Sequence, residues 1–522
     1  MSQPESRRAP AAVQSPGLDR NILAAAKGGG IVFVGKVFTY GSRFLIAFLL
    51  ARLLGAEGYG SYNLALSAAT IAGGLALVGL DAALLRYIAL WRSRSDDAGV
   101  WGALQVGLVV TTVLSVLIGT ALFALSYWIA ATVFHDIRLA PYLQLSAVIV
   151  PLLTLSNILA GATRGFKNFH HFVIAQYFVQ PLVRVILIVS FVLIGLGIEQ
   201  AILIYGIADL SASLLLLYFL NKEFSLRRPL KSGRREVRAL LSFSVPIWLS
   251  DSMLTFRNSI QIVLLGSLAT VTTVGIFAVA SQLNLVADLV QSSVTTAVKP
   301  IIVEVHDQGK RMDLASLYQT VSKWMFAFNL PIFLIVVLFP TQILSLFGKS
   351  FTLGAEALTI LAWASLVDAA TGMCGAVLDY SGYAKLKLFN SVLRLALSIS
   401  LNLWLIPIWG MVGAAVAVLV SELVVNLLRV GQVYYLLRIL PYNLSSLIPV
   451  LAGIVALVMT LIIGQVLALD YIVEMIVQCL ALLVVYTALL WKFGLADQDQ
   501  IILSHIGRRA RKRVGRFVPG LT

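Results

Sequence analysis

Long apolar runs alternate with short polar breaks along almost the whole chain. The stretch "LLARLLGAEGYGSYNLALSAA", residues 49–69, is typical, because one apolar run stops at a glycine-rich turn and another begins at once. Runs of about twenty apolar residues match the hydrocarbon thickness of a bilayer. The pattern predicts fourteen transmembrane helices, near 22–53, 58–90, 99–130, 140–163, 170–196, 200–220, 239–267, 271–304, 315–339, 355–381, 386–406, 410–437, 444–467 and 471–492.

Composition narrows the fold class. Hydrophobic residues make up 59% of the 522 residues, charged residues only 12%, and the mean hydropathy is +0.92. A water-soluble chain of this length would need far more polar residues to cover its core. We therefore expect an all-α polytopic membrane protein. Cys374 and Cys479 both lie in apolar segments and offer no disulfide framework or zinc spacing, so no metal or cofactor is expected.

The distribution of Lys and Arg predicts the orientation. If the N-terminus is cytoplasmic, the inner loops carry most of the basic residues, whereas the outer loops hold Arg52, Arg138, Lys349 and little else. The positive-inside rule then places both termini in the cytoplasm and the chain in the cell membrane. We expect a disordered N-tail, 1–21, and a basic C-tail, 494–522, that contacts anionic membrane lipids. No folded domain outside the membrane is available to bind nucleic acid.

The segment "LLGSLATVTTVGIFAVASQLN", residues 264–284, echoes the first turn about two hundred residues later. Both are expected to turn outside the membrane at a glycine followed by an aromatic residue, in Gly60-Ser61-Tyr62 and Gly275-Ile276-Phe277. The basic cytoplasmic linker 221–238 separates six predicted helices from the next six. Two six-helix lobes, 22–220 and 239–437, would therefore be related by a parallel pseudo-twofold axis, with two further helices in 438–493.

The run "LLARLLGAEGYGSYNLALSAATIAGGLALVGLDAALLRYIA" resembles the first helical hairpin of the polysaccharide transporter family. That family belongs to the multidrug/oligosaccharidyl-lipid/polysaccharide flippase superfamily and includes O-antigen-unit flippases. The shared features are an Arg-Leu-Leu-Gly-x-x-Gly-Tyr-Gly corner, here Arg52–Gly60, and an Arg-[Tyr/Phe]-Ile/Ala segment, here Arg86–Ala89. The fourteen-helix layout also fits.

The resemblance implies a MATE-like fold with two lobes around a central cleft. It also implies a flippase that moves a polyprenyl-linked oligosaccharide from the inner to the outer leaflet for the biosynthesis of a polysaccharide such as lipopolysaccharide or exopolysaccharide. Contact with polysaccharide assembly enzymes would accompany that role.

Ionisable residues inside the predicted spans are the best candidates for functional sites. A lipid-facing charge at the midplane costs about 2.5–3.5 kcal/mol, so most of these residues must line water or pair with one another. Lys36, Tyr40 and Arg43 are spaced four and then three residues apart, and so share one face of the first helix. We expect this face to line a cavity.

The seventh predicted helix offers Asp251, Arg257 and Asn258 on the opposite wall of the same cleft. Together with Arg43 and Lys36, Arg257 would make the centre of the cleft basic. A basic cavity suits a lipid with an anionic pyrophosphate head, because arginine binds phosphate oxygens with paired hydrogen bonds and keeps its charge on burial.

The other intramembrane charges leave two interpretations open. They could line the cavity and carry proton or sodium coupling, or they could form structural ion pairs, such as those of Arg184 with Asp209 and of Arg394 with Glu422. The residues concerned are Arg184, Arg394, Asp288, Asp368 and Glu422.

The sequence also bears on two functions other than that of a flippase. A membrane polymerase or glycosyltransferase generally needs a large outer loop, but the outer loops here are short and contain no nucleotide-binding or metal motif, so we expect no enzyme. A MATE-type multidrug or cation antiporter would need carboxylates near the centre of the cleft. The first helix carries Lys36 and Arg43 at that depth, although Asp251 and Asp288 keep this alternative open.

Overall fold

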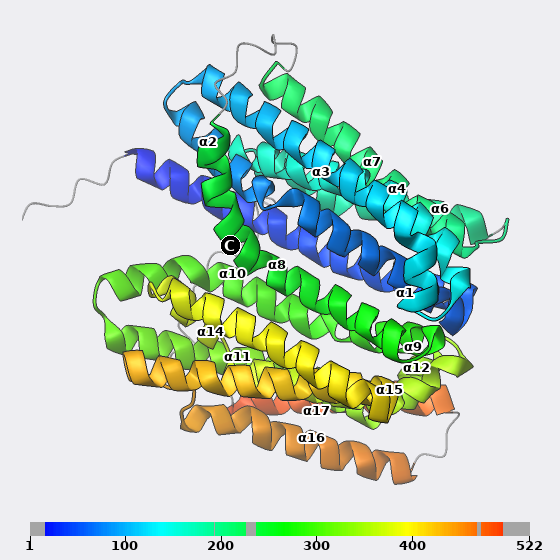
Figure 1. The fold of residues 1–522 in the computed structure, drawn as a ribbon. Helices are drawn as coiled ribbons and strands as arrows, with labels where there is room; N and C mark the ends of the chain where they lie inside the picture. Colours follow the sequence, from blue (N-terminus) through cyan, green and yellow to red (C-terminus); the bar gives the residue numbers. More distant parts are fainter. Residues whose placement is uncertain (1–15, 193, 226–235, 467–470, 494–522) are drawn as a thin grey trace, which may run out of the picture.

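The computed structural model describes residues 16–192, 194–225, 236–466 and 471–493. Over these ranges the chain is helical and contains no strand. Figure 1 shows the helices as two groups lying side by side with roughly parallel axes. The all-α fold expected from the apolar runs is therefore confirmed.

The first group, called here the first half, contains α1 to α7 (Figure 1). A six-residue π-helix, Ile174–Val179, joins α5 to α6 in this group. The helices are α1 (Pro16–Leu77), α2 (Leu80–Ser93), α3 (Asp97–Thr132), α4 (Ala140–Gly165), α5 (Phe169–Val173), α6 (Gln180–Val192) and α7 (Ile198–Glu223).

The second half runs from α8 to α15, and α16 and α17 pack beside α11 at its edge. The helices are α8 (Val237–Leu268), α9 (Val271–Leu283), α10 (Leu285–Asp307), α11 (Arg311–Leu338), α12 (Pro340–Ser345), α13 (Ala355–Thr371), α14 (Cys374–Tyr380), α15 (Ala384–Leu437), α16 (Leu447–Val466) and α17 (Tyr471–Phe493).

Two helices run through a sharp bend. In α1 the bend lies at Gly55 (φ 67°), and in α15 it lies at Gly410 (φ 55°). Both are left-handed conformations that glycine adopts without steric cost. α15 therefore spans two of the predicted segments, 386–406 and 410–437, whereas α1 covers the first predicted segment and part of the second, which α2 continues. Ten helices of the described residues are long and apolar enough to cross a membrane, and the count of fourteen crossings stays a prediction.

Gly60 and Gly275 have a different role from the one expected. They are not turn residues: they lie inside α1 and α9, where the two halves meet. A Cβ atom on Gly60 would collide with the carbonyl oxygen of Val271, and one on Gly275 would collide with the carbonyl oxygen of Ala56. The reciprocal contact lets the two backbones touch, as small residues do in membrane helix pairs.

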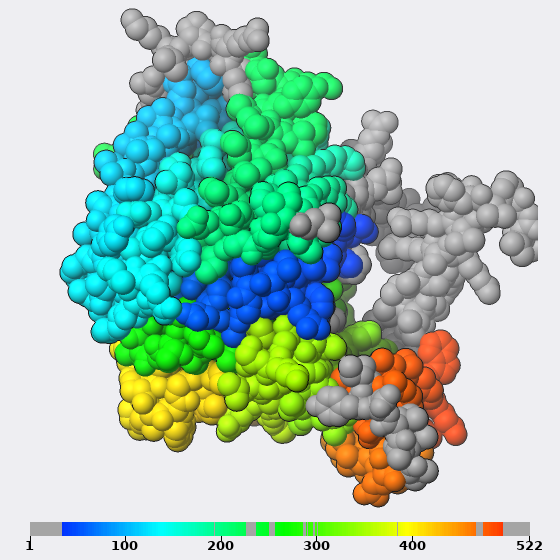
Figure 2. Space-filling view, turned by 90° about the vertical axis from the view of Figure 1, so that its right-hand side faces the viewer, coloured from blue at the N-terminus to red at the C-terminus, as the bar shows by residue number. Residues whose placement is uncertain are grey.

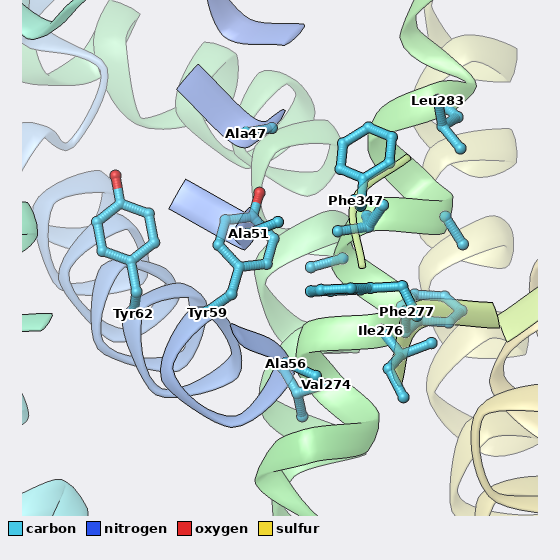
Figure 3. Close-up of a cluster of buried hydrophobic side chains, with 14 of the residues drawn as sticks. Ala47, Ala51, Ala56, Tyr59, Tyr62, Val274, Ile276, Phe277, Leu283 and Phe347 are labelled. Carbon is cyan, nitrogen blue, oxygen red and sulfur yellow. The ribbon is translucent and has the colours of Figure 1, made fainter. Parts of the chain in front are cut away.

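Aromatic and aliphatic side chains close the end of the bundle near this glycine contact. Figure 3 shows Tyr59 and Tyr62 on the α1 side of the cluster, opposite Ile276 and Phe277 of α9. Phe347, just after α12, packs edge-on against two phenylalanines of α1. In Figure 2 the blue surface of α1 abuts the green surface of the second half at this end. The halves are thus in direct contact here.

α8 connects the two halves. Its first turns lie beside α2, where the Tyr87 hydroxyl donates a hydrogen bond to the carbonyl oxygen of Ala239 (3.1 Å). Further along, α8 packs against α15, and Gln261 donates to the carbonyl oxygen of Ala414 (3.2 Å). Residues on either side of α8 can therefore face different environments.

Candidate functional site

A polar cavity of about 310 Å³ lies in the second half, between α8, α9, α13 and α15, and we call it the charged cavity. One residue of the first half, Asn63, reaches its wall. Four of the lining residues are ionisable: Arg257, Asp368, Arg394 and Glu422.

Glu422 is the centre of the charge network. Its Oε1 accepts hydrogen bonds from Nη1 of Arg257 (2.6 Å) and Nη1 of Arg394 (3.1 Å), and its Oε2 lies 3.0 Å from Nη2 of Arg394. The Glu422 side chain is only 10% exposed, whereas that of Arg257 is 28% exposed. A single buried carboxylate thus holds two guanidinium groups, and Arg257 is the more accessible of the two.

Asp368 extends the network along α13. Its Oδ1 accepts a hydrogen bond from Asn426 (2.9 Å) and its Oδ2 accepts one from Gln291 (2.6 Å). Asn426 also donates to Glu422 (3.3 Å) and so joins the two acids. The lining of this cavity thus contains two arginines and two acids, so it is not lined by basic residues alone. Asp368 is held by the side-chain amides of Gln291 and Asn426 rather than by an arginine.

The structure brings only part of the predicted site to this cavity. Arg257 and Asn258 line it, and the Asn258 Oδ1 accepts a hydrogen bond from Nε of Arg257 (3.3 Å). The predicted face of α1, formed by Lys36, Tyr40 and Arg43, does not line it. The side chains of Asp251 and Asp288 lie outside the described residues.

The face of α1 meets a different set of residues. Arg43 is exposed, and Lys36 and Tyr40 are partly exposed. Lys36 lies near enough to Lys299 of α10 for the two ammonium groups to repel each other, and Lys299 also lies over the ring of Tyr380 (5.5 Å). Two cations, one from each half, therefore lie near each other, and among the described residues neither forms an ion pair.

Arg184 and Asp209 form a separate ion pair in the first half. Nη2 of Arg184 lies 2.8 Å from Oδ2 of Asp209, and Gln180 donates a hydrogen bond to the other carboxylate oxygen. The guanidinium group lies over the ring of Tyr205, 3.6 Å from its centroid. Asp209 is 3% exposed. Both ion pairs named from the sequence are present, but the two interpretations are not exclusive: Arg394 and Glu422 also line the charged cavity, whereas Arg184 and Asp209 do not.

Sequence reasoning did not single out Asn426 or Gln291. One signal was available for Asn426, since it follows Glu422 by four residues and so shares its helix face. Gln291 of α10 has no such local signal, because only the packing of α10 on α13 brings it to Asp368. Within the described residues, no group of three His, Cys, Asp or Glu side chains is placed to hold a metal ion.

Comparisons with protein families match most of the chain. The model of the family described as "Polysaccharide biosynthesis protein" matches residues 25–306, and that of the MatE family matches residues 246–404. Stage V sporulation protein B of Bacillus subtilis is 24% identical over 460 residues, which are 82% of this chain and 88% of that protein. The probable low-salt glycan biosynthesis flippase Agl15 of Haloferax volcanii is 24% identical over 44% of this chain and 49% of its own length.

Two solved structures show the same fold. The lipid II flippase MurJ, in an inward closed conformation, aligns with a TM-score of 0.69 at 14% identity, covering 88% of this chain and 98% of its own. A multidrug resistance MATE family transporter of the MOP superfamily, in an inward-facing conformation, aligns with a TM-score of 0.64 at 16% identity, covering 78% and 98%. The MATE-like fold expected from the sequence is thus confirmed.

Proposed function

The chain belongs to the polysaccharide biosynthesis protein family, and from this premise we propose that it is a flippase rather than an enzyme. Its substrate is a polyprenyl-(pyro)phosphate-linked oligosaccharide, which it carries from the cytoplasmic to the outer leaflet of the cell membrane. The relative Agl15 is named a probable glycan biosynthesis flippase, and the structurally similar MurJ is named a lipid II flippase. We place both termini in the cytoplasm, as the loop charges predict.

The observation that carries the proposal is a pair of guanidinium groups at the wall of a polar cavity within apolar helices. Arg257 and Arg394 share the single carboxylate of Glu422. A phosphate oxygen can replace Glu422 as the acceptor for Arg257, while Glu422 keeps its contact with the more buried Arg394. Arginine suits this exchange because it stays charged on burial and offers paired donors to phosphate.

The opposed lysines support an anionic substrate as well. Lys36 and Lys299 come from different halves and repel each other. An anion between them would remove that repulsion and draw the halves together. Arg43 lies further along the same face of α1 as Lys36. There it would contact the anionic head group as the lipid moves through the protein.

The contact between the halves suggests how access alternates. The Gly60–Gly275 contact and the aromatic cluster close one end of the bundle. If the halves act as two lobes, separation at this end would open a path to the outer leaflet and close the inner one. Asp368 and Glu422 are the candidates for proton or sodium coupling, because each is a buried acid at the charged cavity.

The proposal is tested in proteoliposomes that contain the full chain and a fluorescent polyprenyl-pyrophosphate-linked oligosaccharide. We expect wild-type protein to move the label to the opposite leaflet and Arg257→Ala to slow transfer about tenfold or more, because a desolvated charge-assisted contact is lost. Arg257→Lys should recover only part of the rate, since lysine lacks the paired donors.

The matched control is Arg94→Ala, which removes an exposed arginine that follows the last turn of α2 and lines neither cavity. It should transfer lipid at the wild-type rate. Transfer by Arg257→Ala at the wild-type rate would contradict the role of this arginine, and absence of transfer by the wild type would contradict the flippase itself.

A multidrug or cation antiporter is the second candidate. The observation that favours it is the pair of carboxylates at the charged cavity, Asp368 and Glu422. In the same proteoliposomes, uptake of a fluorescent organic cation that depends on a proton or sodium gradient and is lost in Asp368→Asn would support the antiporter. Gradient-dependent lipid transfer without cation uptake would support the flippase.

A further inference from the structure

A second cavity, of about 290 Å³, lies on the other side of α8, between that helix and the first half of the chain. We call it the aromatic cavity, because Tyr205, Trp248 and Phe256 line it. Its polar lining includes Thr70, Asp81 and Asn157. None of the residues predicted from the sequence to contact substrate lies in its wall.

The rings of Trp248 and Phe256, both on α8, are held in fixed orientations at a steep angle to each other. Nε1 of Trp248 donates a hydrogen bond to the carbonyl oxygen of Gly74 (2.8 Å), which sets the plane of the indole. The ring of Phe256 stands at 80° to it, with centroids 6.3 Å apart. A Cβ atom on Gly74 would lie 2.7 Å from the Phe256 ring, so glycine is what allows this approach.

The third ring, Tyr205, is fixed from the first half. The Arg184 guanidinium lies over its face, and Asp209 holds Arg184 in turn. Such a cation–π contact is worth up to about 2 kcal/mol when it is desolvated. The ion pair of the first half therefore acts on this cavity through Tyr205, although Arg184 and Asp209 themselves do not line it.

The polar groups offer mainly hydrogen-bond acceptors. Asn157 is exposed and uses its Nδ2 on the carbonyl oxygen of Leu153 (2.9 Å), which leaves its Oδ1 to accept. The Asp81 carboxylate lies 3.8 Å from Nη2 of Arg164 and supplies two further acceptor oxygens. None of the described residues that line this cavity is a lysine or arginine.

We propose that the aromatic cavity is a subsite for one neutral sugar ring of the transported lipid-linked oligosaccharide, an inference that rests on the proposed flippase function. The apolar C–H face of a pyranose stacks on an aromatic ring, while its hydroxyls donate to a carboxylate and an amide oxygen. A phosphate fits this cavity less well, because none of its described lining residues is a lysine or arginine that could bind phosphate oxygens. The cavity lies at the small end of the roughly 300–1,000 Å³ range of ligand pockets, and so fits a single ring.

The subsite is built from both halves of the chain. Trp248 and Phe256 come from α8, whereas Tyr205, Asn157 and Asp81 come from the first half. A sugar bound between them holds α8 against the first half, and movement of α8 opens the subsite.

The test compares two probes on the purified full chain: polyprenyl pyrophosphate, and the same lipid carrying one neutral hexose. We expect wild-type protein to bind the hexose-bearing lipid about tenfold more tightly, as one stacked ring and its hydrogen bonds would give. Trp248→Ala should abolish this difference and leave the affinity for the bare pyrophosphate unchanged.

A second variant covers the case in which Trp248→Ala fails to fold. Gly73 lines the cavity, and a Cβ atom there would make only ordinary contacts, the nearest at 3.6 Å to Thr154, so Gly73→Leu fills the cavity from a site that accepts a side chain. Gly431→Leu is the matched control, because that helical glycine is exposed with open space around it. Gly73→Leu should lose the preference for the hexose, and Gly431→Leu should keep it.

The outcomes separate the two proposals. Equal binding of both lipids by the wild type, or a full preference for the hexose in Gly73→Leu, would overturn the sugar subsite and leave the flippase standing. Binding of neither lipid by folded wild-type protein would overturn the flippase and the subsite together.

Discussion

Each half of the molecule contains a buried arginine–carboxylate pair, and the two pairs have different surroundings. Their helices would correspond if the halves are the two lobes expected from the sequence. In the first half Arg184 and Asp209 join α6 to α7, the fifth and sixth predicted segments. In the second half Arg394 and Glu422 join the two arms of α15, the eleventh and twelfth. The first pair lies off both described cavities, against Gln180 and Tyr205. The second lines the charged cavity.

The difference lies in how much charge each acid must compensate. Asp209 holds one guanidinium group, which also rests on an aromatic face. Glu422 holds two, and it is linked through Asn426 to the second acid, Asp368. A buried ion pair stabilises a fold only weakly when it is replaced as a unit, but removing one partner leaves a costly buried charge. We infer that the first pair serves structure and that the second keeps Arg257 available for an anion.

The strongest test of this difference between the two ion pairs is to remove each acid alone. Glu422→Gln leaves Arg257 and Arg394 facing each other without a carboxylate between them, so we expect it to destabilise the protein by about 3–5 kcal/mol. Asp209→Asn should cost less, because Arg184 keeps its contact with Tyr205, worth up to about 2 kcal/mol. Thermal unfolding of the purified variants in one detergent measures both. Equal losses of stability in the two variants would show that the second arginine bound to Glu422 does not add to the cost of removing the acid.

Replacing each pair as a unit sharpens the comparison further. The double variant Arg184→Met/Asp209→Leu should unfold within about 1 kcal/mol of the wild type, because an apolar pair of similar volume needs no desolvation. Arg394→Met/Glu422→Leu should remain less stable by about 3 kcal/mol, because Arg257 loses its only ion-pair partner among the described residues. Unfolding of both doubles at the same temperature as the wild type would contradict the assignment of Arg257 to this network.

Much of the fold follows from local sequence. Apolar runs of membrane length predict the helices, and the turn in the opening stretch falls at Gly55, because glycine alone adopts that backbone without strain. The role of Gly60 does not follow from local sequence. A helical glycine and a turn glycine look alike in one sequence, and only the approach of α9 separates them.

The candidate site, too, follows only in part from local sequence. Helical spacing correctly puts Lys36, Tyr40 and Arg43 on one face, but it does not say which neighbour that face meets, because the rotation of a helix is set by all its packing partners. Arg257 could be placed at a cavity because a charge deep in a span must find water or a partner. The carboxylate that holds it lies 165 residues away, and no local pattern connects the two.

The smallest effect on stability is expected at a third arginine–carboxylate pair, formed by Asp136 and Arg138 outside the membrane spans. Asp136 precedes α4 outside the spans, and its carboxylate accepts hydrogen bonds from Nε and Nη2 of Arg138, both at 2.9 Å. These bonds hold the pKa of Asp136 below its ordinary value of 3.8. A carboxyl whose pKa is lower in the folded state stabilises the fold above its unfolded pKa, and that contribution is lost as the pH falls through the folded pKa.

Asp136→Asn should therefore destabilise the protein at pH 6 by only about 0.2–1 kcal/mol, because water screens an exposed pair. The difference in unfolding temperature from the wild type should shrink as the pH is lowered from about 5 towards 3, where the wild-type carboxyl also becomes protonated. Glu199→Gln removes an exposed acid from the first turn of α7, where it has no ion pair among the described residues, and so controls for the loss of a carboxylate near a helix N-terminus without an arginine partner. Asp136→Asn should cost more than this control if the bonds to Arg138 contribute. A loss at Asp136 as large as that at Glu422 would mean that burial does not set the strength of these three pairs.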